Sequence, residues 1–284
     1  MTALRQEDIL DICRRALAED VGSGDATSIA VVPADSRCTA RLNTREECVC
    51  AGLDVASEVF RELDPGCRFS PNVADGDLCS AGTCLAEVRG HARALLTAER
   101  TALNFLQRLA GIATQTRRYV QHTEGTRAVI LDTRKTTPGL RMLEKYAVSA
   151  GGGVNHRLGL HDRIMIKDNH RVLARLDGPD GIARAVGRCR ETFPELEVEV
   201  EADTLDEVRQ ALDAGADIIL LDNMNDERMR KAVKLVAGAA RLEASGGITL
   251  ERIAAVAATG VDYISVGALT HSVPAIDIGM EIRA

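Results

Sequence analysis

Basic residues are concentrated in one segment of the chain, between residues 134 and 171. This segment holds eight Lys or Arg and three acidic residues, although the whole chain has a formal net charge of −7. Clustered positive charge attracts anions, and the planar fork of Arg suits carboxylate and phosphate groups. We therefore expect a pocket for a multiply charged anion, built around Arg134, Lys135, Arg157 and Lys167.

The positions of these residues relative to apolar runs separate binding candidates from surface charges. Arg134 and Lys135 follow the run that ends at Asp132, and Lys167 directly follows Ile-Met-Ile, which is too apolar to be an exposed strand. His156 stays ambiguous, because a single His is more often structural than catalytic. The other basic side chains of the segment are expected at the protein surface: Arg141, Lys145, Arg163 and Arg171.

From about residue 127 onward, short apolar runs alternate with stretches of helical pattern. Alternation of this kind predicts a parallel sheet, and in an α/β barrel the carboxyl ends of the strands form the active-site face. We predict an incomplete parallel α/β barrel of about six strands. Each run ends in a polar, charged or glycine residue: Asp132, Lys167, Glu201, Asp222, Ser245 and Gly267.

Two glycine-containing strand ends are candidates for binding phosphate. Ser245-Gly246-Gly247 follows the penultimate strand and precedes a helix expected to begin at Thr249, and Gly267 ends the last strand. In such barrels, loops at these positions commonly hold phosphate on backbone N–H groups and a helix N-terminus. A plain turn is the alternative for each loop.

The carboxylates of Glu201 and Asp222 need a reason to lie beside an anionic ligand. They could hold Mg²⁺, which prefers oxygen ligands. They could also stabilise a positive charge that develops during the reaction. Both possibilities suit transfer from a sugar phosphate.

Residues 1–112 have a different pattern, with a helix over 5–18, strands near 37–43 and 84–91, and a helix near 52–63. We predict a small N-terminal α+β domain here, joined by a C-terminal tail (271–284). A long helix is expected over roughly 95–120, and residues 113–270 are assigned to the barrel.

Composition excludes several classes of function. Aromatic residues make up 2% of the chain and Trp is absent, which together with the negative charge argues against nucleic acid as a partner. No segment has the length and apolarity of a signal peptide or membrane span, so we expect a cytoplasmic protein. The eight Cys contain no CxxC pair and no zinc-site spacing, and we expect buried free thiols.

The chain resembles quinolinate phosphoribosyltransferases, the decarboxylating enzymes of de novo NAD synthesis, from about residue 7 to its end. Of the shared motifs, Leu131-Asp-Thr-Arg-Lys-Thr-Thr-Pro-Gly139 is the most specific. The others are Glu19–Ser28, Arg100–Arg108, Asn155-His-Arg157, Ile166–His170, Glu199-Val-Glu201, Leu221-Asp-Asn223 and Glu243–Ile248.

The resemblance implies a pentosyltransferase that joins quinolinate to phosphoribosyl pyrophosphate and releases nicotinate mononucleotide, pyrophosphate and CO₂. It implies a requirement for Mg²⁺ and no organic cofactor. Lys135, Glu201 and Asp222 would be catalytic, with Glu201 and Asp222 acting directly or through Mg²⁺. The substrates would contact these three residues together with Thr133, Arg134, His156, Arg157, Lys167, Ser245, Gly246, Gly247 and Gly267.

The resemblance also implies a homodimer or a higher oligomer in which Arg100 of one subunit completes the site of its neighbour. Two other interpretations stay open at this level. One is a related barrel transferase that acts on a different nitrogen heterocycle. The other is a non-enzymatic anion-binding barrel, which leaves Glu201 and Asp222 unexplained.

Overall fold

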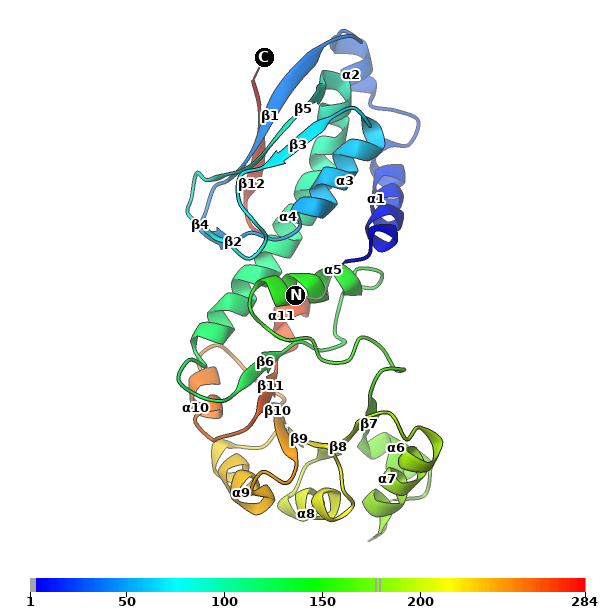
Figure 1. The fold of residues 1–284 in the computed structure, drawn as a ribbon, viewed down its shortest axis with the longest axis vertical. Helices are drawn as coiled ribbons and strands as arrows, with labels where there is room; N and C mark the ends of the chain where they lie inside the picture. Colours follow the sequence, from blue (N-terminus) through cyan, green and yellow to red (C-terminus); the bar gives the residue numbers. More distant parts are fainter. Residues whose placement is uncertain (1–3, 177, 179, 284) are drawn as a thin grey trace. The chain divides into compact units, whose positions relative to one another are not determined.

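The fold was analysed in a computed structural model that describes residues 4–176, 178 and 180–283. The chain forms two compact units (Figure 1). The first unit consists of Met1–Arg117, Thr136–Gly152 and Leu269–Ala284, and the second of Arg118–Lys135 and Gly153–Ala268.

The first unit is built on an antiparallel sheet with strand order β12-β1-β5-β3 and a separate pair, β2-β4. Its strands are β1 (Arg37–Thr44), β2 (Cys48–Val49), β3 (Arg68–Pro71), β4 (Leu78–Cys79), β5 (Cys84–His91) and β12 (Ile278–Arg283). Its helices are α1 (Gln6–Val21), α2 (Ala26–Val31), α3 (Leu53–Leu63), α4 (Ala92–Gln121), which continues into the second unit, and α5 (Arg141–Ala150). Strand β12 pairs with β1, so the end of the chain lies in the sheet of the N-terminal residues.

Helix α1 shows how the sequence pattern produces this unit. Its apolar residues Ile9, Ile12, Cys13 and Leu17 recur at helical spacing and are buried, and α1 packs against α3. All eight cysteines are free thiols, and four of them are buried. Burial raises the pKa of the Cys13 thiol to about 12, which makes it an unreactive core residue.

The second unit confirms the prediction of an incomplete barrel with six parallel strands. The strand order is β6-β11-β10-β9-β8-β7, and Figure 1 shows the helices of this unit on the outer side of the strands. The strands are β6 (Val129–Leu131), β7 (Ile164–Ile166), β8 (Val198–Ala202), β9 (Ile218–Asp222), β10 (Arg241–Ser245) and β11 (Tyr263–Ser265). The helices are α6 (Asp168–Leu173), α7 (Gly181–Thr192), α8 (Leu205–Asp213), α9 (Asp226–Val236) and α10 (Ile253–Ala257).

The irregular part of the barrel is the seam between β6 and β7, which do not pair with each other in the described part of the chain. Residues 153–163 lead to β7 along this seam. Val154 forms a single parallel bridge with Leu131, and its N–H donates to the Ile130 carbonyl at 2.9 Å. The segment that carries Asn155-His156-Arg157 is therefore anchored to the edge of β6.

The prediction of a surface position is wrong for Lys145, whose side chain is fully buried in α5. The helix is enclosed on most of its circumference, because Leu143, Glu144, Ala147 and Val148 are buried as well. Arg163 and Arg171 are also largely covered, with side chains only 20% and 14% exposed. Each of these two arginines pairs with a glutamate of a neighbouring element, Arg163 with Glu197 and Arg171 with Glu207.

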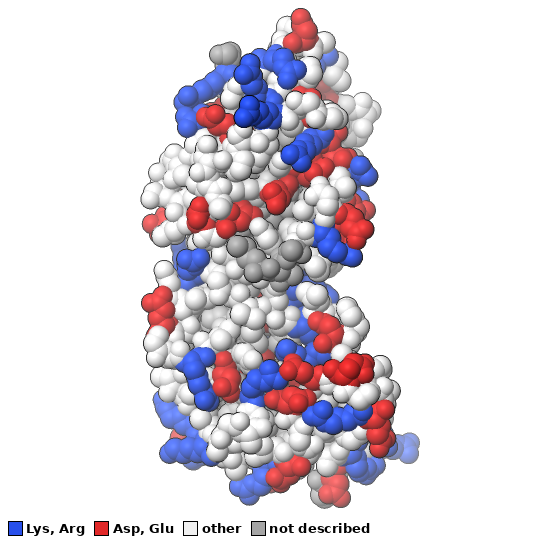
Figure 2. Space-filling view, in the orientation of Figure 1, with Lys and Arg blue, Asp and Glu red and all other residues white. Residues whose placement is uncertain are grey.

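None of the described helices combines the length and apolarity needed to cross a membrane. On the face shown in Figure 2, positive and negative side chains are interspersed over the second unit (lower half).

Candidate functional site

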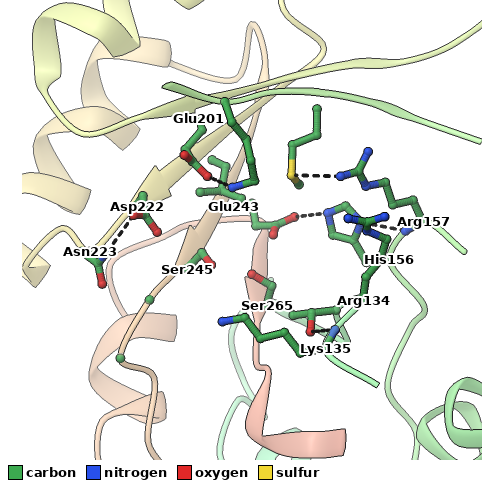
Figure 3. A pocket seen from close by; sticks show the side chains of 16 residues that line it. Arg134, Lys135, His156, Arg157, Glu201, Asp222, Asn223, Glu243, Ser245 and Ser265 are labelled. Carbon is green, nitrogen blue, oxygen red and sulfur yellow. Dashed lines mark hydrogen bonds and ion pairs between the residues drawn. The ribbon is translucent and has the colours of Figure 1, made fainter. Parts of the chain in front are cut away.

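A cavity of about 550 Å³ lies at the carboxyl ends of the strands in the second unit (Figure 3). Such a volume is typical of sites for small molecules. Most of the predicted site residues line this cavity. They are Thr133, Arg134, Lys135, His156, Arg157, Lys167, Glu201, Asp222, Ser245, Gly246 and Gly247.

Two predicted site residues are not among those that line the cavity. Gly267 follows the end of β11, two residues beyond Ser265, which does line it. Arg100 is exposed on α4 in the first unit, whereas every residue that lines the cavity belongs to the second. The expected role of Arg100 therefore remains a prediction.

Sequence reasoning missed five residues that line the cavity, and four of them share a signal. Each of the four lies two positions before a predicted site residue that ends the same strand or lies just beyond its end: Met165 before Lys167, Leu220 before Asp222, Glu243 before Ser245, and Ser265 before Gly267. Side chains two apart on a strand point to the same face, and barrel interiors are filled in such layers. The strand period could therefore have identified a second layer beneath the predicted one.

The basic side of the cavity is formed by arginines from the β6 end and the seam segment. Arg157 is 9% exposed, and burial together with the nearby charge of Arg134 lowers its pKa. Its Nη1 donates to the Arg163 carbonyl at 3.1 Å and its Nη2 contacts the Met165 sulfur at 3.6 Å. The two guanidinium groups therefore repel each other, and an anion with more than one negative charge that binds between them would relieve this repulsion.

The acidic side is formed by carboxylates from the adjacent strands β8 and β9. Glu201 forms an ion pair with Lys167, and Asp222 Oδ2 accepts a hydrogen bond of 2.7 Å from the side-chain amide of Asn223. Both contacts are visible in Figure 3. Asn223 is the fifth missed residue, and the strand period could not have found it, because it lies just after the strand in a left-handed conformation (φ 51°).

The glycine loop after β10 has a left-handed backbone conformation, which favours glycine. Gly246 and Gly247 have φ of 89° and 60°, and a Cβ on Gly246 would lie 2.2 Å from Asn223 Oδ1. The helix predicted to start at Thr249 begins only at Ile253 and has five residues, so the predicted start is wrong. Residues 249–252 form turns instead, and a phosphate here would rest on the loop rather than on a helix N-terminus.

His156, which lines the cavity, faces the carboxylates of Glu199 and Glu243, and we call these three residues the buried trio. Nε2 lies 3.2 Å from Glu199 Oε2 and 3.4 Å from Glu243 Oε2, and none of the three residues is more than 6% exposed. Burial and the charge of Glu243 raise the pKa of Glu199. Against the cost of burial, the two carboxylates raise the pKa of His156 to about 9.

A second cavity of about 500 Å³ adjoins the first and shares Arg134, Arg157, Met165 and Lys167 with it. Its other walls include Leu160 and Phe193, which are 72% and 49% exposed. The site is therefore bordered by an apolar surface with a basic rim.

The second unit is an incomplete barrel with a cationic cavity and a glycine loop at its strand ends. These features indicate a barrel enzyme that binds multiply anionic ligands. The chain belongs to the quinolinate phosphoribosyl transferase family. Residues 112–281 match the C-terminal domain of that family, and residues 25–110 match its N-terminal domain.

Individual relatives cover nearly the whole chain. A probable nicotinate-nucleotide pyrophosphorylase (carboxylating) of Bacillus subtilis is 46% identical over 265 residues, which is 93% of this chain and 90% of the relative. The nicotinate-nucleotide pyrophosphorylase (carboxylating) of Mycobacterium leprae is 47% identical over 96% of both chains. The crystal structure of NadC from Streptococcus pyogenes superposes with a TM-score of 0.94 at 41% identity, covering 100% of this chain and 99% of that one.

Proposed function

We propose that this chain transfers the phosphoribosyl group of phosphoribosyl pyrophosphate to quinolinate and releases CO₂, with nicotinate mononucleotide and pyrophosphate as the other products. The observation that carries the proposal is the composition of one cavity. Figure 3 shows Arg134 and Arg157 on one side of it and Glu201 and Asp222 on the other, and Lys167 and the glycine loop at 246–247 line the same cavity.

Quinolinate has two adjacent carboxylates, and the close guanidinium groups of Arg134 and Arg157 suit a dianion of this shape. Guanidinium binds carboxylate through paired hydrogen bonds. Lys167 and His156 complete the proposed carboxylate pocket, and the Thr133 hydroxyl fixes the loop by accepting the Lys135 N–H at 3.0 Å. Lys135 is exposed and can reach a substrate carboxylate or the departing pyrophosphate.

In the proposed transfer, the pyridine nitrogen forms a bond to ribose C1 while the bond from C1 to pyrophosphate breaks. The electron pair of that bond leaves with the pyrophosphate, and positive charge develops on the sugar. Glu201 and Asp222, held by Lys167 and Asn223, are placed to stabilise this charge.

The donor groups present fit Mg²⁺ that arrives with the pyrophosphate of the substrate. Mg²⁺ prefers oxygen ligands, keeps several waters, and is often held by one or two carboxylates together with substrate phosphates. Asp222 on β9 and Glu201 on β8 would hold it. When bound, the ion would neutralise charge on the leaving pyrophosphate.

Loss of CO₂ requires no further group from the protein in this proposal. Once the nitrogen is bonded to the sugar, it carries a positive charge next to C2. The bond from C2 to its carboxylate breaks, the electron pair stays on C2, and a proton from solvent replaces CO₂. The contribution of the protein is to form the pyridinium and to position that carboxylate.

We further propose a homodimer in which Arg100 of the partner completes the carboxylate pocket. Arg100 is exposed on α4, and the apolar Leu160 and Phe193 beside the cavity are unusually exposed for their residue types. A partner subunit would cover this apolar surface and add a further positive charge to the dianion site.

The activity is tested by incubating the purified protein with quinolinate, phosphoribosyl pyrophosphate and Mg²⁺ while following CO₂ and nicotinate mononucleotide. We expect both products in equal amounts and no turnover of nicotinate. Absence of product, or equal turnover of nicotinate, would contradict the proposal and favour a transferase for another heterocycle or a binding protein.

The shared site is tested by mixing two inactive homodimers, Arg100→Ala and Lys135→Ala, under conditions that exchange subunits. Half of the dimers would then be mixed, each with one intact site, so we expect roughly a quarter of the wild-type activity. If each site is built from a single chain, mixing restores no activity.

A further inference from the structure

Two members of the buried trio, Glu199 and Glu243, have no assigned role in the transfer, although the trio lies in the barrel interior beside the proposed carboxylate pocket. Figure 3 shows the Glu243 carboxylate pointing at the His156 ring. Arg163 Nη1 also lies 3.9 Å from Glu199 Oε2, and none of the described residues meets the geometry of a hydrogen bond to either carboxylate. Two buried carboxylates of this kind are costly unless they are paired. Their retention therefore calls for a function.

The direction of the hydrogen bond at the His156 ring determines which ring nitrogen carries the proton. The backbone N–H of Arg157 donates to Nδ1 at 2.7 Å, so Nδ1 must present a lone pair. The ring proton must then be on Nε2, between Glu199 and Glu243. The two carboxylates favour a second proton on the ring, which would have to lie on Nδ1. That proton would point at the N–H of Arg157, whose nitrogen is 2.7 Å from Nδ1, so the backbone contact keeps Nδ1 unprotonated.

This proton position argues against a metal ion in the trio. The three ligand atoms lie within 4.8 Å of one another, which is close enough for a cation. Coordination would need a lone pair on Nε2 and therefore a proton on Nδ1, where the Arg157 N–H already lies. Both ring nitrogens are thus engaged inside the barrel.

The same short segment is held from a third strand. Asp132, at the end of β6 and fully buried, accepts the His156 backbone N–H at 2.8 Å and the Asn155 amide at 2.7 Å. Asp132, Glu199 and Glu243 follow or belong to β6, β8 and β10. The seam segment has only the single bridge at Val154 among the described residues, and these buried acids add to that anchorage.

We propose that the buried trio is a positioning device for Arg157, in which the carboxylates fix the His156 tautomer and Nδ1 fixes the Arg157 backbone. The inference rests on the proposed function, since it assigns His156 to the orientation of the dicarboxylate pocket rather than to direct contact with the substrate. It also makes the trio a determinant of selectivity for a 2,3-dicarboxylate over a 3-monocarboxylate.

Two substitutions of His156 separate positioning from direct binding. In His156→Asn, the Oδ1 atom replaces Nδ1 and keeps the acceptor for the Arg157 N–H. In His156→Gln, the amide reaches toward the carboxylates and the acceptor beside Arg157 is lost. Binding of pyridine-2,3-dicarboxylate and of pyridine-3-carboxylate to the whole protein is measured by calorimetry, with exposed His122→Gln as the control.

We expect His156→Gln to weaken dicarboxylate binding by about tenfold or more and His156→Asn by about threefold or less. The KM for phosphoribosyl pyrophosphate should stay within about twofold in both variants, a split that general loss of structure would not give. If His156→Asn does not fold, Glu199→Gln/His156→Asn, which has one buried charge less, takes its place.

Direct contact between His156 and the substrate predicts the reverse order, because only Gln keeps a donor amide at the distant end of the side chain. That order, or a stoichiometric divalent metal in the purified protein that Glu243→Gln removes, would overturn the inference. Failure of wild-type protein to bind the dicarboxylate is a different outcome, because it contradicts the proposed function itself.

Discussion

Asn223 donates a 2.7 Å hydrogen bond from its side-chain amide to the carboxylate of Asp222. Its backbone N–H donates to the Ser245 carbonyl at 2.9 Å, at the start of the glycine loop. One residue thus connects the carboxylate expected to face the developing charge with the loop expected to face the phosphate. The positive φ of Asn223 (51°) allows both contacts, and Asn tolerates this conformation better than most residues.

Replacing Asn223 with Gly should therefore lower activity without lowering stability. Gly keeps the left-handed backbone but removes the amide that orients Asp222. We expect kcat/KM for phosphoribosyl pyrophosphate to fall about tenfold or more, as for other groups that orient a reactive residue. The control is Ala237→Gly, which has a similar φ of 48° at the end of α9. Equal kinetics for the two variants would contradict the orienting role.

A second prediction compares two glycines with the same backbone conformation. Gly246 has φ 89° and Gly238 has φ 84°, but a Cβ on Gly238 would meet no atom within 4 Å. Both changes to Ala carry a similar conformational cost of about 1 kcal/mol, and only Gly246→Ala also drives a methyl group into Asn223. We expect kcat/KM for phosphoribosyl pyrophosphate to fall only in Gly246→Ala. Thermal denaturation of both proteins separates this loss from the shared backbone cost.

The sequence predicted the layout of the barrel because parallel strands and their intervening helices are encoded locally. The run that became β9, for example, is an uninterrupted Ile-Ile-Leu-Leu between a helix end and Asp222. The capping box at the start of α8 likewise joins Thr204 to Glu207, only three positions further along the chain. Features of this kind depend on neighbours within a few residues.

The parts that escaped prediction depend on contacts between residues far apart in the sequence. Lys145 looks like a surface lysine on an isolated helix, and only the packing around α5 buries it. Glu243 gives no sign in its own strand that it meets His156, which is 87 positions earlier in the printed sequence. The lack of space for a Cβ at Gly246 is likewise caused by a distant residue, Asn223, which follows the end of another strand.

Asp64 is expected to make the stability of the first unit sensitive to acid. The backbone N–H of His91 (2.8 Å), aided by the His91 ring and the Gly66 N–H, holds the pKa of Asp64 below its usual range despite burial. A carboxylate with a lowered folded-state pKa adds stability above its unfolded pKa of about 4, and that stability is lost as the pH falls through the folded value.

Asp64→Asn should therefore be less stable than wild type at about pH 6, and the difference should shrink below about pH 4. Urea unfolding of the two proteins across this pH range measures the effect. Asp11→Asn is the control, since Asp11 lies exposed on α1 and pairs with Arg15 through a surface contact of 2.9 Å. A constant difference at all pH values would show that the Asp64 carboxylate contributes no pH-dependent stability.

Arg108→Met should be strongly destabilising because it leaves a buried charge without its partner. Arg108 Nη2 lies 2.7 Å from the carboxylate of Glu144, which has no exposed surface. Loss of one partner of a buried pair costs about 3 kcal/mol or more. Arg14→Met is the matched control, since the Arg14 side chain is 63% exposed in its ion pair with Glu62. This substitution should lower the free energy of unfolding by about 1 kcal/mol or less. Denaturant unfolding compares the two, and equal costs would refute the distinction.

Lys135→Ala should abolish turnover while leaving the fold intact. The side chain is exposed at the mouth of the cavity, so its removal leaves no buried space and should change stability by about 0.5 kcal/mol or less. The same change at Lys231, an exposed lysine on α9 that pairs with Glu227, controls for loss of one surface charge. Turnover and binding are measured separately, by product formation and by calorimetry with quinolinate. Retained turnover in Lys135→Ala would remove this residue from the mechanism, whereas lost turnover with intact quinolinate binding would assign it to the transfer step rather than to the dicarboxylate pocket.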